Sequence, residues 1–248
     1  MKTVIAIACT SLSLFTGCLE GADEARVDEV EQPTICGPTN ELQHVNSYNG
    51  TLGPSIAFVQ ANKGSKGAME TTTTSGKFCS GSLISANMFL TAGHCVDAGT
   101  VGEFVSFNFE RAANSTALLP QTHVRITAVL EDERGGVDYA IVQLAGTPGN
   151  TFGIAPVAAG DPAVGAALTI IGHPSGAPKQ IEAGTLSSIS GDFLRYGNID
   201  TLGGNSGSGI LNSAGQIVGV HTLGGCTSTG GVNSGPRISR IRAVSNIL

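Results

Sequence analysis

Charged residues are scarce in this sequence, and no run of basic residues occurs anywhere in it. They make up 13% of 248 residues, and the net charge is −6. Nonspecific nucleic-acid binding relies on clustered Lys and Arg that displace phosphate counterions, so we expect no nucleic-acid partner. Gly, Ser, Thr and Val are abundant instead. This balance is typical of many short strands joined by tight turns rather than of a helical bundle.

Two other features are missing. No cysteine spacing matches a zinc site, so we expect no metal. Beyond the N-terminal leader, no apolar stretch has the length of a transmembrane helix, and no internal repeat occurs.

Residues 1–17 have the features of a signal peptide. Lys2 supplies a positive charge, and Val4–Phe15 is largely apolar and is followed by two small residues. The end of this stretch, Leu14–Cys18, also resembles a bacterial lipobox, in which Cys18 becomes the lipidated first residue. We therefore expect an exported protein, either attached to the bacterial outer membrane through lipidated Cys18 or secreted.

The segment after the leader is acidic. Residues 18–45 contain few large apolar side chains and cannot build a core, so we expect a tether or a propeptide there. The folded domain is then expected over residues 46–248, as a monomer. Removal of the leader and Cys18 leaves four cysteines, and an even number in an exported chain indicates disulfides.

Apolar residues in the remainder recur at the spacing of short strands. The predicted strands are 78–84, 88–91, 104–109, 123–130 and 139–144, followed by 167–171, 180–189, 193–198, 208–211 and 216–222. Ile238–Leu248 has helical spacing. We therefore expect an all-β fold of two β-barrels with a C-terminal helix.

Three sequence contexts supply the groups of a serine nucleophile, whose hydroxyl needs a base and whose base needs an orienting carboxylate. His94 follows an apolar strand, and Asp138 begins another. Ser206 lies in the glycine-rich Gly203–Gly209, whose backbone can approach a substrate closely. The amides of Gly204 and Ser206 are the candidates for an oxyanion hole. The chemistry requires no cofactor.

The chain order of these groups excludes one enzyme class. The order His, Asp, Ser differs from the Ser, Asp, His order of α/β-hydrolases. Ser206 also lacks the Gly-x-Ser-x-Gly elbow, because position 208 is Ser. A noncatalytic surface-binding protein built on a protease scaffold is the rival interpretation, and the intact set of His, Asp and Ser argues against it.

Four motifs resemble those of a known family: Phe78–Ile84, Thr91–Cys95, Asp138–Ala140 and Gly204–Gly207. They are similar to the motifs of chymotrypsin-like (trypsin-like) serine peptidases, and Gly-Gly-Asn-Ser-Gly-Ser at 203–208 resembles the bacterial glutamyl endopeptidase branch. The resemblance implies two six-stranded antiparallel barrels with the active site between them. It also implies an endopeptidase that hydrolyses polypeptides through an acyl-enzyme, with His94, Asp138 and Ser206 as its triad.

The same resemblance implies a disulfide and the loss of an activation switch. Cys79 and Cys95 are expected to pair beside the histidine, which leaves Cys36 and Cys226 to tie the N-terminal segment to the specificity pocket. Trypsin-like enzymes have an Asp before the catalytic Ser, which receives the new α-amino group when the zymogen is cut. Here that residue is Asn205, whose neutral amide cannot form the ion pair. Hydrogen bonds, or another use of the N-terminus, must order the oxyanion loop.

Substrate-binding residues are implied by the resemblance as well: Thr201, His221, Thr222, Gly224 and Asp200. His221 and Thr201 match the carboxylate-binding residues of glutamyl endopeptidases and predict cleavage after Glu, and also after Asp. Asp200 matches the Arg/Lys-binding residue of trypsin and predicts the alternative. A substrate Glu and an ionised Asp200 repel each other in a small pocket. We favour cleavage after Glu, with Asp200 facing away; a core histidine is the alternative for His221.

Overall fold

The structure is a computed structural model that describes residues 34–248. The expected signal peptide, the lipidation site Cys18 and the acidic residues up to 33 lie outside the described residues. Within 34–248, no helix has the length and apolar character needed to cross a membrane.

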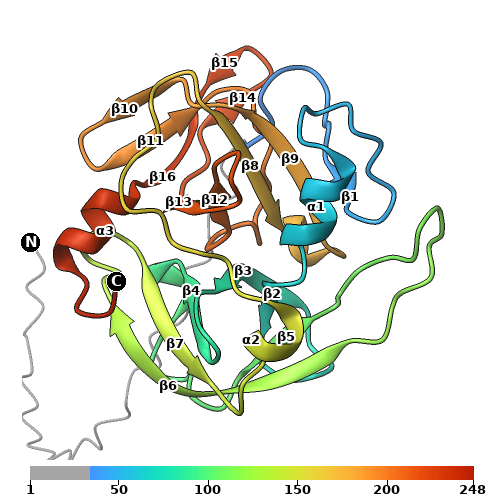
Figure 1. The fold of residues 1–248 in the computed structure, drawn as a ribbon, viewed down its shortest axis with the longest axis vertical. Helices are drawn as coiled ribbons and strands as arrows, with labels where there is room; N and C mark the ends of the chain where they lie inside the picture. The colour runs from blue at the N-terminus through green and yellow to red at the C-terminus, as the bar shows by residue number, and fades with distance from the viewer. Residues whose placement is uncertain (1–33) are drawn as a thin grey trace, which may run out of the picture. The chain divides into compact units, whose positions relative to one another are not determined.

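The N-terminal half of the described chain forms a closed antiparallel barrel (Figure 1). Its strands are β2 (Lys66–Glu70), β3 (Lys77–Leu83), β4 (Met88–Thr91), β5 (Phe104–Phe107), β6 (Thr122–Asp132) and β7 (Ala140–Leu144), closed in the order β2-β3-β4-β7-β6-β5. Phe89 and Phe107 fill its interior edge to face, with ring centroids 6.2 Å apart. A Cβ on Gly81 would lie 2.3 Å from the Phe89 ring, so this strand position requires glycine.

The C-terminal half, joined by β1 from the start of the described chain, consists of sheets and one helix. A five-stranded sheet has the order β1-β9-β8-β12-β13, and a three-stranded sheet has the order β10-β11-β16. The strands are β1 (Gln43–His44), β8 (Ala167–Gly172), β9 (Gln180–Thr185), β10 (Ser188–Ser190), β11 (Phe193–Tyr196), β12 (Gly209–Leu211), β13 (Ile217–Val220) and β16 (Asn233–Pro236), with a small pair β14 (Cys226–Thr227) and β15 (Gly230–Gly231). The predicted C-terminal helix is α3 (Ile238–Val244).

The mostly β fold and its C-terminal helix confirm the predicted fold class, but a second closed barrel is not confirmed. An isolated bridge between Gly219 and Arg237 links the two C-terminal sheets on one side. On the other side, no ladder in the described chain joins β9 to β10. The Thr185 N–H instead donates to Oδ1 of Asn198 at 3.1 Å.

Short helices connect these sheets. They are α1 (Ile56–Asn62), α2 (Gly149–Phe152) and the 3₁₀ turns η1 (Gly93–Cys95) and η2 (Pro174–Gly176). Helix α1 begins at Ser55, whose Oγ accepts the Phe58 N–H at 3.1 Å, the usual N-cap bond.

Buried polar residues join the barrel to the C-terminal sheets. Lys179, just before β9, lies 2.9 Å from Glu110, which follows β5, and both side chains are buried. Burial alone would raise the pKa of Glu110, but Lys179 and Lys63 lower it to about 2. The two halves are therefore connected by a paired charge cluster as well as by apolar contacts.

Candidate active site

One carboxylate holds both the ring and the backbone of His94. Nδ1 of His94 lies 2.9 Å from Oδ2 of Asp138, and the His94 N–H donates to Oδ1 of Asp138 at 2.9 Å. With Nδ1–H directed at the carboxylate, Nε2 is the ring nitrogen left to accept a proton. The His94 side chain is 31% exposed, although Nε2 itself is buried.

Local backbone geometry brings Asp138 to the histidine. Asp138 has a φ of 59°, in the left-handed region that Asp tolerates better than most residues, and its N–H donates to the Glu133 carbonyl at 2.8 Å. A Cβ on Gly93 would lie 3.1 Å from Oδ1 of Asp138 and 2.7 Å from the Arg134 backbone. Glycine before His94 therefore permits the close approach.

Ser206 lies in a turn that packs against the strand leading to His94. The Ser206 carbonyl accepts the Ser80 N–H at 2.8 Å, and the Cys95 sulfur is 3.7 Å from the same oxygen. A Cβ on Gly207 would lie 2.1 Å from the Ser80 carbonyl oxygen and 2.9 Å from the Ala92 nitrogen. The backbone at Ser206 and Gly207 therefore lies next to Ala92 and Cys95, on either side of His94 in the chain.

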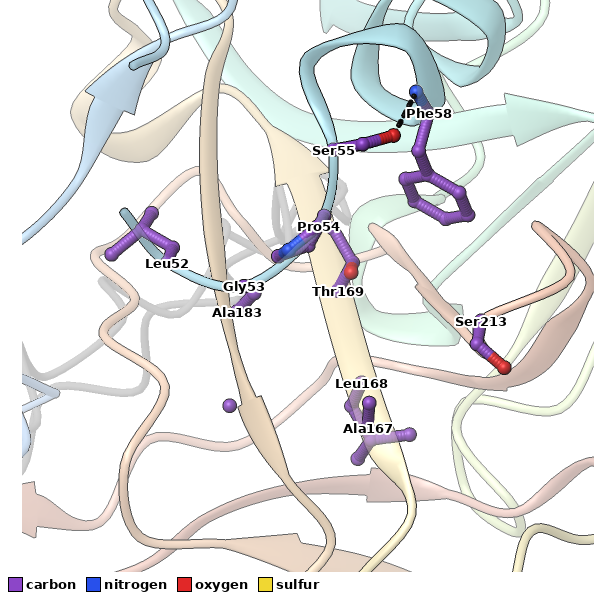
Figure 2. Close-up of a pocket in the computed structure, with 11 residues that line it drawn as sticks. Leu52, Gly53, Pro54, Ser55, Phe58, Ala167, Leu168, Thr169, Ala183 and Ser213 are labelled. Atoms are coloured by element: carbon purple, nitrogen blue, oxygen red, sulfur yellow. Dashed lines mark hydrogen bonds between the residues drawn. The ribbon is translucent and has the colours of Figure 1, made fainter. Parts of the chain in front are cut away.

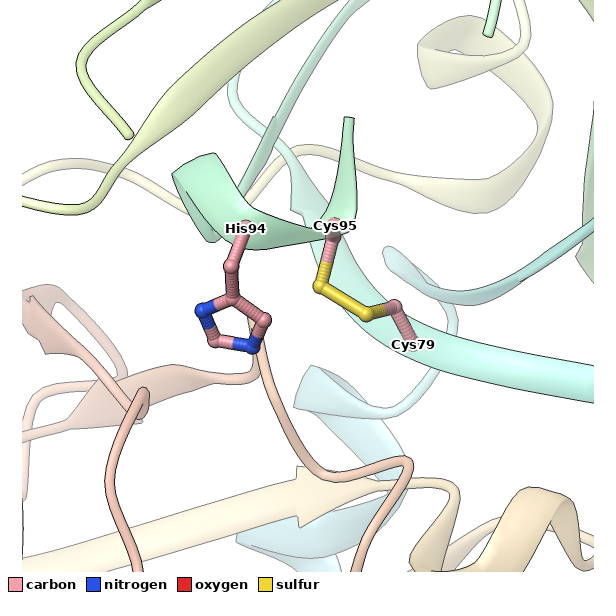
Figure 3. A group of neighbouring side chains, drawn as sticks. All are labelled: Cys79, His94 and Cys95. Atoms are coloured by element: carbon pink, nitrogen blue, oxygen red, sulfur yellow. A yellow bond between two sulfur atoms is a disulfide. The ribbon is translucent and has the colours of Figure 1, made fainter. Parts of the chain in front are cut away.

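Both predicted disulfides are confirmed, Cys36–Cys226 and Cys79–Cys95. Figure 3 shows the His94 ring beside the second of them. The ligand atoms of Cys79, His94 and Cys95 lie within 4.8 Å of one another. The two sulfurs are bonded to each other, however, and therefore offer no thiolate to a metal ion.

His221 is buried beside a tyrosine. The Tyr196 hydroxyl lies 2.6 Å from Nδ1 of His221, and both side chains are buried. Burial, with a smaller contribution from the charge of His94, lowers the pKa of His221 to about 3. Burial also raises the pKa of Tyr196. His221 is therefore neutral at pH 7. A tyrosine hydroxyl that donates to Nδ1 leaves the imidazole proton on Nε2.

Asp200 faces the N-terminal segment. Its Oδ1 accepts the Cys36 N–H at 2.7 Å and its Oδ2 accepts the Glu41 N–H at 2.9 Å. The next residue, Thr201, is buried, and its hydroxyl has no partner among the described residues. The same holds for the hydroxyl of Thr222. Both carboxylate oxygens of Asp200 are thus engaged by backbone N–H groups. The buried hydroxyls of the predicted residues Thr201 and Thr222 are available to a ligand.

Asn233 links the backbone next to the predicted residue Gly224 with the backbone next to the predicted residue Asp200. Its Oδ1 accepts the N–H groups of Gly225 and Cys226 at 3.0 and 3.1 Å. Its Nδ2 donates to the Ile199 carbonyl at 2.9 Å and to the Thr34 carbonyl at 2.7 Å. The predicted residue Gly224 lies half-buried in the loop that this amide holds.

Asn233, Tyr196 and Ser80 were not among the residues predicted from the sequence. Tyr196 is 25 residues away from His221, and only the folded chain brings the two together. Asn233 is fully buried in a strand without large apolar residues, and no local sequence pattern indicates that it links two distant segments.

The described residues also form a cavity of about 350 Å³ away from these residues. Figure 2 shows it between the segment leading into α1 and strands β8 and β9. Its lining includes Leu52, Pro54, Phe58, Leu168, Thr169 and Ala183. None of the predicted site residues lines it, so we do not assign the site there.

The sequence profile of the trypsin-like peptidase domain matches residues 79–220, which contain all three predicted triad residues. The chain belongs to the trypsin-like peptidase family. As a member of this family it is a serine endopeptidase, a hydrolase whose substrates are polypeptides. Its two disulfides are consistent with an exported protein.

Solved structures agree with the trypsin-like peptidase fold. A Glu endopeptidase in complex with MPD is 25% identical to the chain, with a TM-score of 0.61, and the match covers 82% of this chain and 94% of that one. A serine endoprotease from Yersinia pestis is 18% identical, with a TM-score of 0.58, over 75% of this chain and 63% of that one. The second likeness concerns the fold alone. A comparison with curated protein sequences found no match.

Proposed function

We propose that the endopeptidase acts by acyl transfer through His94, Asp138 and Ser206. The Ser206 hydroxyl attacks the peptide carbonyl while Nε2 of His94 takes its proton. His94 then protonates the leaving amine, and water hydrolyses the acyl-enzyme by the reverse sequence. The supporting observation is the double hold of Asp138 on the His94 ring and backbone, which leaves Nε2 as the base.

The negative charge of the tetrahedral intermediate requires donors at the substrate oxygen. We assign this role to the amides of Gly204 and Ser206. Gly204 has a φ of +88°, a conformation that turns the loop sharply and that favours glycine. Removal of one such donor typically lowers kcat by about 10²–10³-fold, so the orientation of these amides governs the rate.

We propose cleavage after Glu, and also after Asp. The observation that carries this choice is the position of Asp200, whose two oxygens accept backbone N–H groups of the N-terminal segment. A carboxylate occupied in this way is not directed at a substrate Lys or Arg. Nε2–H of His221 and the unpartnered hydroxyls of Thr201 and Thr222 supply donors for a substrate carboxylate. The similarity to a Glu endopeptidase supports the same choice.

We propose that residues 1–17 direct export and that the peptidase domain, which includes β1 (Gln43–His44) as well as residues 46–248, acts as a monomer. Lipidation at Cys18 would attach the protein to the bacterial outer membrane. A Cys18→Ala variant tests the anchor: we expect the wild type to partition with membranes and the variant to appear in the soluble fraction. Identical partitioning of both proteins argues for plain secretion.

Labelling with a fluorophosphonate probe tests the proposed nucleophile. We expect the probe to label the folded protein and to fail with Ser206→Ala. The matched control is Ser208→Ala, which removes a buried, unpartnered hydroxyl two residues away and should be labelled like the wild type. If Ser206→Ala is labelled, or the folded wild type is not, the proposed mechanism is wrong, and the second result favours a noncatalytic binding protein.

A further inference from the structure

The loop that carries Ser206 is ordered without the ion pair of trypsin-like zymogens. Asn205 is 2% exposed, and its side chain lies against β8: a Cβ on Gly172 would be 2.6 Å from Oδ1 of Asn205. A neutral, buried amide gives no counter-charge to an α-amino group. Other contacts must therefore set the direction of the amides at Gly204 and Ser206.

The peptide that carries the Gly204 amide is held from its carbonyl side. The Gly203 carbonyl accepts the Ser175 N–H at 2.5 Å, from turn η2. A trans peptide is planar, with its C=O and N–H pointing in opposite directions. The Gly204 N–H therefore points away from Ser175. Ser175 itself has a φ of 51°, an uncommon conformation for a non-glycine residue.

The peptide that carries the Ser206 amide is held in the same way. The Asn205 carbonyl accepts the Ser208 N–H at 2.9 Å. The remaining peptide of the loop, between Gly204 and Asn205, links the two amides. Its carbonyl orientation decides whether both amides can face the same point.

Two contacts hold this linking peptide: the Asn205 N–H donates to the Leu202 carbonyl at 3.0 Å, and the carbonyl side is held by Ser80. Its Oγ donates to the Gly204 carbonyl at 2.7 Å and accepts the His173 N–H at 2.9 Å, and the residue is 1% exposed. Its backbone N–H also donates to the Ser206 carbonyl at 2.8 Å. One residue of β3 thus connects the end of β8 to two carbonyls of the loop.

We infer that Ser80 is a positioning residue for the oxyanion hole. Its hydroxyl bridges the His173 N–H and the Gly204 carbonyl, and this bridge replaces the ion pair with which trypsin-like zymogens order the same loop. Without the hydroxyl, both groups lose a buried partner. The Gly204–Asn205 peptide then keeps only the bond from its N–H to the Leu202 carbonyl, and its carbonyl is no longer fixed in direction. The inference rests on the roles proposed above for Gly204 and Ser206.

The experiment compares Ser80→Ala with Ser82→Ala. Ser82 is two residues along on β3, is also buried, and accepts a hydrogen bond from Lys66 at 3.1 Å, so both variants delete one buried hydroxyl from the same strand. We expect kcat to fall about ten- to a hundredfold in Ser80→Ala with KM almost unchanged. In Ser82→Ala we expect a lower Tm and an unchanged kcat.

A transition-state analogue separates positioning from general loss of structure. A peptidyl trifluoromethyl ketone forms a tetrahedral adduct whose oxygen occupies the hole, whereas the corresponding product peptide does not. We expect Ser80→Ala to weaken the ketone by the same factor as kcat/KM and to leave product binding unchanged. Rates are divided by the concentration of active sites, measured as the amount of protein that fluorophosphonate labels at completion. A variant that is only partly folded can therefore still be measured.

Each outcome decides the matter. Equal kcat for Ser80→Ala and the wild type overturns the role of Ser80, as does an equal fall in both serine variants. Both results leave the proposed mechanism standing, because Ser206 is still labelled. If the folded wild type is not labelled at Ser206, the proposed function fails and the inference fails with it.

Discussion

The hydroxyl of Tyr196 lies 2.6 Å from Nδ1 of His221, and both side chains are buried. We propose that the hydroxyl donates to Nδ1, which leaves the proton of the neutral imidazole on Nε2. Nε2–H is then the donor proposed for the substrate carboxylate. The specificity proposed here therefore depends on a residue outside the predicted pocket.

Tyr196→Phe removes the hydroxyl and leaves Nδ1 of His221 without a partner. The neutral imidazole can then carry its proton on Nδ1 and lose the Nε2–H donor. A hydrogen bond to a charged group is worth about 1.5–3 kcal/mol, so kcat/KM for Glu peptides should fall about ten- to a hundredfold. Peptides with Leu at the same position do not use Nε2–H and should change little. An equal fall for Glu and Leu peptides would show that Tyr196 supports the fold rather than the selectivity.

Asp200→Asn tests the orientation of that carboxylate. The amide nitrogen of Asn would face a backbone N–H of Cys36 or Glu41, so we expect a loss of stability of about 1–3 kcal/mol and an unchanged cleavage preference. The control is Asp192→Asn, whose side chain is 45% exposed and pairs with Arg240 at the surface; its stability should change by less than about 0.5 kcal/mol. Thermal unfolding measures both. A stable Asp200→Asn variant with altered preference would place Asp200 in the pocket.

Lys66→Met should stabilise the protein in a pH-dependent way. Burial, aided by the charge of Lys179, lowers the pKa of Lys66 from 10.5 to about 7. Between these values the unfolded chain binds more protons, so the lysine's penalty grows as the pH falls through this window and is complete below about 7. We expect a gain of roughly 1–4 kcal/mol at about pH 6 and a smaller gain at about pH 9.

Denaturant unfolding at the two pH values checks this prediction. Lys66→Met leaves the Ser82 hydroxyl without its lysine partner. The double variant Lys66→Met with Ser82→Ala removes that hydroxyl as well and serves as the control. A single variant that is less stable than the wild type at both pH values would contradict the account of Lys66 as a costly buried charge.

The sequence predicted most strands because their apolar residues form short local runs or alternations; the run Met88–Thr91 has the same bounds in the structure. Strand β2 was missed because Lys66 and Glu70 at its ends suggest a surface segment, whereas both are buried. Their partners come from other segments: Ser82 for Lys66, and Lys77 and His123 for Glu70. Burial of a charge depends on such tertiary partners and leaves no mark in local periodicity.

The candidate site likewise contains residues that local motifs predict and contacts that only the folded chain creates. His94, Asp138 and Ser206 lie in short motifs whose glycines are readable locally, and Gly93 and Gly207 meet backbone or carboxylate atoms at close range. The contacts of Ser80 with the Ser206 loop span 124 residues of chain. No local sequence pattern could have predicted the contact between Ser80 and this loop.

Cleavage of a matched peptide panel tests the central claim most directly. The peptides differ only in the residue before the scissile bond: Glu, Asp, Arg, Lys, Leu or Ala. The proposed pocket predicts the highest kcat/KM for Glu, a selective loss of that preference in His221→Ala, and its retention in Asp200→Ala. Preference for Arg or Lys that disappears in Asp200→Ala would contradict it and would make His221 a core residue.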